Sequence, residues 1–111
     1  SLLNMGYIKH HAIIVTHDTG RLEELRTWAV EHKLPCSEIV KGLSNGTESF
    51  FIAPDGSKEG WRVSDEQEAL RNQFITLLKT RPSVPDFIAV SFGGDDPELA
   101  AITASNGNIS Y

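Results

Sequence analysis

The sequence predicts an α+β domain, in which an antiparallel β-sheet carries two helices on one of its faces. Three observations predict this class. Two amphipathic segments have helical periodicity, and the runs between them are short and rich in β-branched and aromatic residues. An Asn-Gly pair also separates two of these runs, which is typical of a tight hairpin.

The first strand is expected at residues 7–17, where the sequence YIKHHAIIVTH is rich in β-branched residues. Its apolar run at residues 12–15 puts apolar side chains on both faces, which is typical of a central strand. His10 and His11 are adjacent in this strand, so they point to opposite faces and cannot bind one metal ion.

Two amphipathic helices are expected. In the first, DTGRLEELRTWAVEHKL, either Asp18 or Thr19 can cap the N-terminus, and Pro35 ends the helix. In the second, SDEQEALRNQFITLLKT, Ser64 and Gln67 form a capping box. The stripes expected to face the core are Leu22, Leu25, Trp28 and Ala29 in the first helix, and Leu70, Phe74, Leu77 and Leu78 in the second.

Four more strands complete the pattern. Two short ones, near residues 37–43 and 47–53, flank Asn45-Gly46, which favours a type I′ turn because both central residues need positive φ. FIAVSF at residues 87–92 forms the next strand, and ELAAITAS adds an extra C-terminal strand.

The order strand, helix, strand, strand, helix, strand is the split β-α-β pattern (β-α-β-β-α-β) of a ferredoxin-like fold. Right-handed crossovers place both helices on one face of an antiparallel sheet, and the two parallel-related strands are expected in its middle. Residues 5–111 are interpreted as one domain, since no linker or internal repeat is visible. Residues 1–4 are interpreted as an expression tag or a disordered N-terminus.

Composition argues against several classes of partner. Ten Lys and Arg against fifteen Asp and Glu give a net charge of −5, so nucleic acid is not an expected partner. No apolar run approaches membrane-spanning length, so no membrane partner is expected, and no signal peptide is visible. The lone Cys36 suits a reducing compartment and has no catalytic signature around it.

Three segments, MGYIKHHAIIVT, NGTESFFIAPDGSKEGWRVSD and DFIAVSFGGDD, resemble those of small bacteriophage and prophage proteins without an assigned function. The resemblance covers residues 5–96, and PDGSKEGW is its most specific motif. It implies a setting, the cytoplasm of a bacterial host cell, but it supplies no activity and no functional residue.

The loop APDGSKEGWRVSD, residues 53–65, is the candidate ligand site. In a functional interpretation, Lys58 and Arg62 contact an anion while Trp61 stacks on a ring. In a structural interpretation, Trp61 covers the end of the core and both cations are solvated. Acidic residues already occupy the N-terminus of the following helix, so the structural interpretation is favoured.

Neither a metal nor another cofactor is expected. His17 begins an HDT segment that is similar to half of a paired His-x-Thr phosphoesterase site, but the sequence holds no second copy. The adjacent Asp95 and Asp96 could hold Mg²⁺, yet in GGDD before a proline they are expected to form a turn.

The sheet face without helices is expected to carry Tyr7, Lys9 and His11, together with Ile13 and Val15. Such a patch is typical of an interface, so a homodimer is expected. It should weaken toward about pH 5 as two His11 rings repel each other.

The sequence therefore predicts a non-enzymatic binding protein, a protein-interaction module that engages a host or phage protein. Two alternatives stay open. One is a small-molecule or nucleotide binder that uses the loop at residues 54–64, and the other is a small hydrolase built around His11 or His17.

Overall fold

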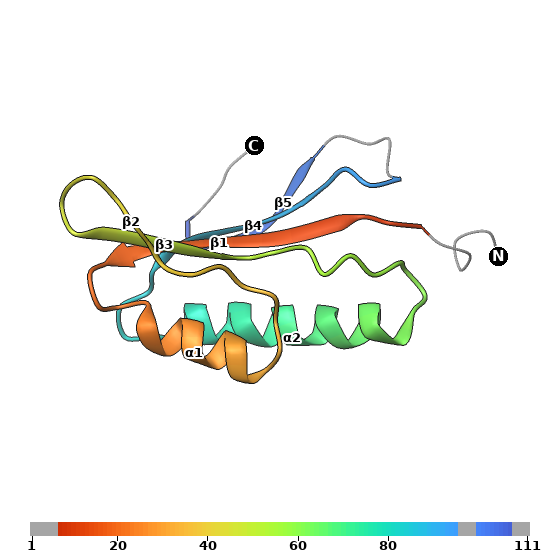
Figure 1. The fold of residues 1–111 in the computed structure, drawn as a ribbon, viewed down its shortest axis with the longest axis horizontal. Helices are drawn as coiled ribbons and strands as arrows, with labels where there is room; N and C mark the ends of the chain where they lie inside the picture. Colours follow the sequence, from red (N-terminus) through yellow and green to blue (C-terminus); the bar gives the residue numbers. More distant parts are fainter. Residues whose placement is uncertain (1–6, 96–99, 108–111) are drawn as a thin grey trace.

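The computed structural model describes residues 7–95 and 100–107, in which a sheet and two helices form two layers (Figure 1). The elements are, in chain order, β1 (His10–Asp18), α1 (Glu23–Glu31), β2 (Val40–Lys41), β3 (Thr47–Ile52), α2 (Arg62–Lys79), β4 (Asp86–Phe92) and β5 (Ala101–Ser105). The strands form an antiparallel sheet in the order β2-β3-β1-β4-β5. Both helices lie on one side of this sheet (Figure 1), so the predicted α+β class is confirmed.

Strand β1 is central, as its apolar run predicts. It pairs with β3 on one side and with β4 on the other, and both neighbours run antiparallel to it. The expectation that two parallel-related strands occupy the middle of the sheet is therefore wrong. The β2–β3 hairpin explains the difference, because it returns the chain and places β3, rather than β2, beside β1.

The core lies between the helices and the sheet face that they cover. On β1 this face carries Ile13 and Val15, which are buried against helix residues such as Leu25 and Phe74. The opposite face of the sheet, which carries no helix, is the open face (Figure 1). The expectation that Ile13 and Val15 lie on the open face is wrong. An apolar run of four residues fits either face, and shifting the assignment by one residue exchanges the two faces of a strand.

The predicted hairpin turn is confirmed. Asn45 and Gly46 have φ values of 57° and 64°, as a type I′ turn requires. The backbone N–H of Thr47 donates to the carbonyl of Ser44 over 3.3 Å and closes the turn. Strand β2 is shorter than the expected residues 37–43. Outside it, the backbone N–H of Ser37 donates to the carbonyl of Phe51 over 2.9 Å, and the Ser37 hydroxyl oxygen accepts the N–H of Phe51.

Replacing Gly46 with valine is expected to destabilise the protein by about 1–3 kcal/mol, because a β-branched residue resists positive φ. A Cβ at this position would also stand 2.9 Å from the Thr19 hydroxyl oxygen. Urea denaturation measures the loss. Gly107→Val is the control, since a Cβ there meets nothing within 4 Å. Equal stability of the two variants would contradict the role of the turn.

Both predicted helix caps are wrong, although the predicted apolar stripes are confirmed. Helix α1 begins at Glu23 and α2 begins at Arg62, and neither has a side-chain hydrogen bond at its N-cap. The candidate capping groups have tertiary partners instead. The Thr19 hydroxyl donates to the carbonyl of Gly46 over 2.7 Å, and the Gln67 amide donates to the carbonyl of Lys33 over 3.2 Å.

The extra C-terminal strand is present as β5, which pairs with β4 through a register shift between Ala89 and Val90. Some sequence predictions lie outside the described residues. These are residues 1–4, Asp96 of the GGDD turn, residues 98–99 of the fifth strand and residues 108–111 of the tail.

Candidate functional site

At one end of the layer between the sheet and α2, polar side chains replace apolar ones. Three rows of residues that face this layer change character at the same end. On β1, Val15 and Ile13 are followed toward this end by His11 and Lys9. On β4, Phe87 and Ala89 are followed by Ser91. On α2, Leu78 and Phe74 are followed, toward the N-terminus of the helix, by Arg71 and Ser64. Polar groups that interrupt a core on three elements at once are typical of a functional site.

A cavity of about 380 Å³ lies at this polar end. Its walls are Lys9 and His11, the loop that follows β3, and the side of α2 that carries Glu68 and Arg71. A second cavity of about 150 Å³ shares His11, Glu68 and Arg71 with the first, and it also contacts apolar residues including Ile75. The three shared residues therefore stand between a polar and a partly apolar compartment.

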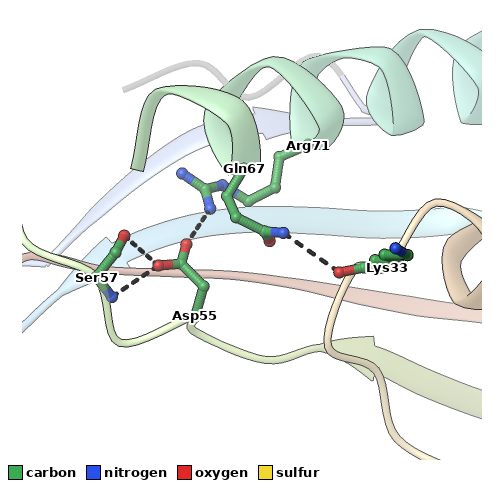
Figure 2. A network of polar contacts seen from close by, with 5 residues as sticks. All are labelled: Lys33, Asp55, Ser57, Gln67 and Arg71. Atoms are coloured by element: carbon green, nitrogen blue, oxygen red, sulfur yellow. Dashed lines mark hydrogen bonds and ion pairs between the residues drawn. The ribbon is translucent and has the colours of Figure 1, made fainter. Parts of the chain in front are cut away.

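The most buried charge at the cavity is Arg71, which is 8% exposed. Its Nη1 donates to Oδ2 of Asp55 over 2.7 Å (Figure 2). The other carboxylate oxygen of Asp55 accepts hydrogen bonds from the backbone N–H and the hydroxyl of Ser57. Burial raises the pKa of Asp55, but the hydrogen bonds from Ser57 and Arg71 outweigh it and hold this pKa below its ordinary 3.8. Asp55 is thus a fixed anion that orients the guanidinium group.

His11 is held in its neutral form. Burial lowers the pKa of its ring below the ordinary 6.5, and the positive charges of Arg71 and Lys9 lower it further. Glu68 and Asp55 act in the opposite direction but do not compensate. At neutral pH the ring therefore offers the cavity one hydrogen-bond donor and one acceptor.

Acid is expected to destabilise the protein through His11. Because the folded-state pKa lies below the unfolded value of 6.5, the unfolded chain binds more protons in this range. The contribution of His11 to the free energy of unfolding is complete above its pKa in the unfolded chain. It is lost as the pH falls through its pKa in the folded protein. Urea denaturation of the wild type and of His11→Asn between neutral pH and about pH 5 measures it. We expect a smaller loss in the variant, and identical pH profiles would contradict the assignment.

The three loop residues predicted to bind a ligand do not line the cavity. The Lys58 ammonium lies 5.9 Å from the centre of the Trp61 ring, so the structure brings these two together. The Arg62 guanidinium pairs with Glu66 at the surface, at 3.1 Å. Trp61 is 49% exposed, so it does not cover the end of the core. The same loop contributes other residues to the cavity, notably Asp55 and Ser57.

Arg71 and Glu68 line the cavity but were not predicted from the sequence as site residues, although the pattern of α2 indicates a polar site. Three, seven and ten residues before Phe74, α2 carries the polar residues Arg71, Gln67 and Ser64, whereas Leu70 is the last apolar residue of the stripe in this direction. A core stripe that becomes polar halfway along a helix indicates that this half faces a polar site.

Two of the predicted interface residues, Lys9 and His11, lie on the side of the sheet that faces α2, where both line the cavity. Their assignment to the open face is therefore wrong, because a shift of one residue along a strand exchanges its two faces. The third, Tyr7, precedes β1, and its backbone carbonyl accepts the N–H of Glu59 in the loop. His10 lies on the open face instead, with its ring 5.5 Å from that of Phe92.

The open face of the sheet is apolar at its centre. Five large hydrophobic side chains on it are between 39% and 64% exposed, and they come from all five strands: Val40, Phe51, Ile14, Phe92 and Ile102. Ile88 and Val90, also on this face of β4, lie between them and are half-buried. Exposed apolar residues gathered on one face are typical of an interaction surface.

The other candidate groups have structural partners. The His17 ring lies 3.2 Å from the Ser83 hydroxyl, and an Asp95 carboxylate oxygen accepts the N–H of Ile8 over 3.0 Å. Burial raises the pKa of the Cys36 thiol, which disfavours the reactive thiolate. Within residues 7–95 and 100–107, no three His, Cys, Asp or Glu side chains are placed to hold a metal ion.

No family model, curated protein or solved structure matches the chain. In the part of the chain that the structure describes, neither helix is long and apolar enough to cross a membrane. The function is therefore inferred from the chemistry of the two surfaces, the polar cavity and the apolar open face.

Proposed function

We propose that this protein works by binding rather than by catalysis, and that it forms a homodimer through the open face of its sheet. The observation that carries the proposal is the set of exposed apolar side chains on that face, centred on Ile14 and Phe51. In a two-fold dimer the same patch meets itself, so the patch has to be self-complementary.

The charge distribution on the open face supports pairing with a second copy. Among the described strand residues of this face, the acidic ones are Asp18 and Asp86, and both lie at the end where β1 finishes. Two copies can therefore bring their apolar centres together without placing like charges opposite each other there.

The exposed apolar area of the open face contributes to association. Five side chains of this kind present an area on the order of a few hundred Å². Burying it on both subunits contributes on the order of 10–20 kcal/mol at about 25 cal/mol per Å². Association costs about 4–15 kcal/mol, so the burial is of the order needed to offset this cost.

Light scattering after size-exclusion chromatography tests the proposal. At neutral pH and micromolar concentration we expect twice the 12.2 kDa mass of one chain. A single-chain mass across the micromolar range would contradict the homodimer and leave the face to a different protein. The weakening toward acid that His11 was expected to cause loses its basis, because His11 does not lie on this face.

The proposal also includes a ferredoxin-like fold and a role in a bacterial cell. The order β2-β3-β1-β4, with β5 added outside β4, supports a ferredoxin-like arrangement with one extra strand. The three phage-like sequence segments support a role in the cytoplasm of a bacterial host cell, where a host or phage protein would be the further partner. The free Cys36 is compatible with that reducing compartment.

A second candidate function is the binding of a small molecule beside the loop at residues 54–64. The specific observation in its favour is the cavity that contains the buried Arg71. Thermal unfolding with small polar compounds tests this function, because a ligand that binds only the folded protein raises the melting temperature.

A further inference from the structure

We propose that the polar cavity binds a free α-amino acid with an aliphatic side chain. In this arrangement Arg71 binds the carboxylate, Glu68 binds the ammonium group, and the side chain enters the adjoining smaller cavity. The inference rests on the second candidate function, the binding of a small molecule at this site.

Arg71 is built to receive a carboxylate. A guanidinium group has five N–H donors in a planar fork, and a carboxylate is one of the groups that matches this geometry. Towards the described residues, Arg71 makes one side-chain hydrogen bond, to Asp55. Asp55 is itself fixed by Ser57 (Figure 2). The guanidinium is therefore pre-oriented at the cavity wall with donors left for a ligand.

The charge of the cavity indicates that the ligand also carries a positive group. Two cations, Lys9 and Arg71, line it together with four acids, Asp55, Glu59, Asp65 and Glu68. This acidic excess disfavours polyanions such as nucleotides, which the sequence had left open. It favours a zwitterion, whose two charges meet partners of opposite sign.

Glu68 is the acid best placed for an ammonium group. It lines both cavities, as Arg71 does three residues further along α2, and its side chain forms no ion pair or hydrogen bond with the described residues. Residues three apart on a helix lie on the same face, so Glu68 and Arg71 present opposite charges side by side. An α-amino acid carries its carboxylate and ammonium groups on one carbon atom, so a single molecule can contact both side chains.

The smaller cavity supplies a compartment for the side chain. It is about 150 Å³ in volume, and its apolar wall includes Ile13, Ile75 and Ala89. The two cavities share the lining residues His11, Glu68 and Arg71, beside which the charged groups of the ligand would lie. The larger volume, about 380 Å³, is near the lower end of ligand sites, which are roughly 300–1,000 Å³. The ligand is therefore small, with an aliphatic side chain.

Thermal unfolding with matched probes tests the inference. L-Leucine is expected to raise the melting temperature by about 5 °C when its concentration is roughly ten times the dissociation constant. Isoamylamine, which is leucine without its carboxylate, and N-acetyl-leucine, which lacks the positive charge, are expected to give no more than a small fraction of that shift. L-Glutamate is expected to bind more weakly than leucine because its side chain is charged.

Glu68→Gln is the matching variant, because Glu68 is exposed and its replacement leaves the core intact. Calorimetric titration with L-leucine should give an affinity about ten-fold lower in this variant, the usual loss for a hydrogen bond to a charged group. Glu66→Gln makes the same charge change on the same helix but touches neither cavity, so its affinity should equal that of the wild type.

Several results would overturn the inference. They are the absence of a shift with leucine and its aliphatic relatives, equal shifts with isoamylamine or N-acetyl-leucine, or an unchanged affinity in Glu68→Gln. A shift with ATP but not with leucine would also overturn the amino-acid ligand, while leaving the small-molecule function in place.

Discussion

Replacing Arg71 with methionine is expected to destabilise the folded protein by about 3 kcal/mol, the lower end of the loss that follows when one partner of a buried ion pair is removed. The side chains of Arg71 and Asp55 are 10% and 14% exposed, and their 2.7 Å contact would be lost. Asp55 would then be a largely buried carboxylate without its counter-charge. The cavity beside it admits water, which is why we expect the lower end.

Chemical denaturation at neutral pH measures this loss, and a double variant controls for it. In Arg71→Met combined with Asp55→Asn, the uncompensated charge is absent, so part of the lost stability is expected to return. If Arg71→Met unfolds at the same denaturant concentration as the wild type, the ion pair does not stabilise this end of the fold.

Replacing Phe51 with glutamate is expected to convert the dimer into a monomer, with an increase in the dissociation constant of more than about 100-fold. Phe51 lies near the centre of the open face, opposite Ile14 in the pairing of β3 with β1. In a two-fold dimer the substitution places a carboxylate from each subunit in the apolar centre, where each is desolvated and faces its twin.

Light scattering of the Phe51→Glu variant measures the effect, with circular dichroism to verify that it is folded. The matched control is Val30→Glu, since Val30 is 50% exposed but lies on α1, on the other side of the sheet. The control should remain dimeric. A dimeric Phe51→Glu protein, or a monomeric control, would place the interface elsewhere.

The sequence predicted those parts of the fold that depend on local patterns. The Asn45-Gly46 turn needs only its own backbone angles, and the apolar stripes that contain Leu25 and Phe74 follow from helical periodicity. The same patterns could not decide which face of β1 is buried, because apolar residues at positions 12–15 satisfy both choices. That choice is made by contacts with α1 and α2, which are distant in sequence.

The helix caps show the same limit. Thr19 and Gln67 have the chemistry of capping residues, but each bonds to a carbonyl that tertiary folding brings close. A local rule cannot foresee such competition between a cap and a distant acceptor.

For the candidate site, the sequence indicated the loop that contributes to the cavity, but not the residues that line it. Lys58, Trp61 and Arg62 were conspicuous because they are large and charged or aromatic, but such side chains are easily accommodated at the surface. The cavity instead depends on Asp55 and on Arg71, sixteen residues further along the chain. Their contact forms only when α2 packs against the sheet beside the loop that follows β3 (Figure 1).

The most direct test of the central claim, that the open face is the dimer interface, is an isotope-filtered NOE measurement. It uses a mixture of ¹³C-labelled and unlabelled protein at neutral pH and detects only contacts between subunits. We expect contacts that join the methyl groups of Ile14 and Ile102 to the aromatic rings of Phe51 and Phe92. Contacts confined to α1 or α2, or none between subunits, would contradict the account.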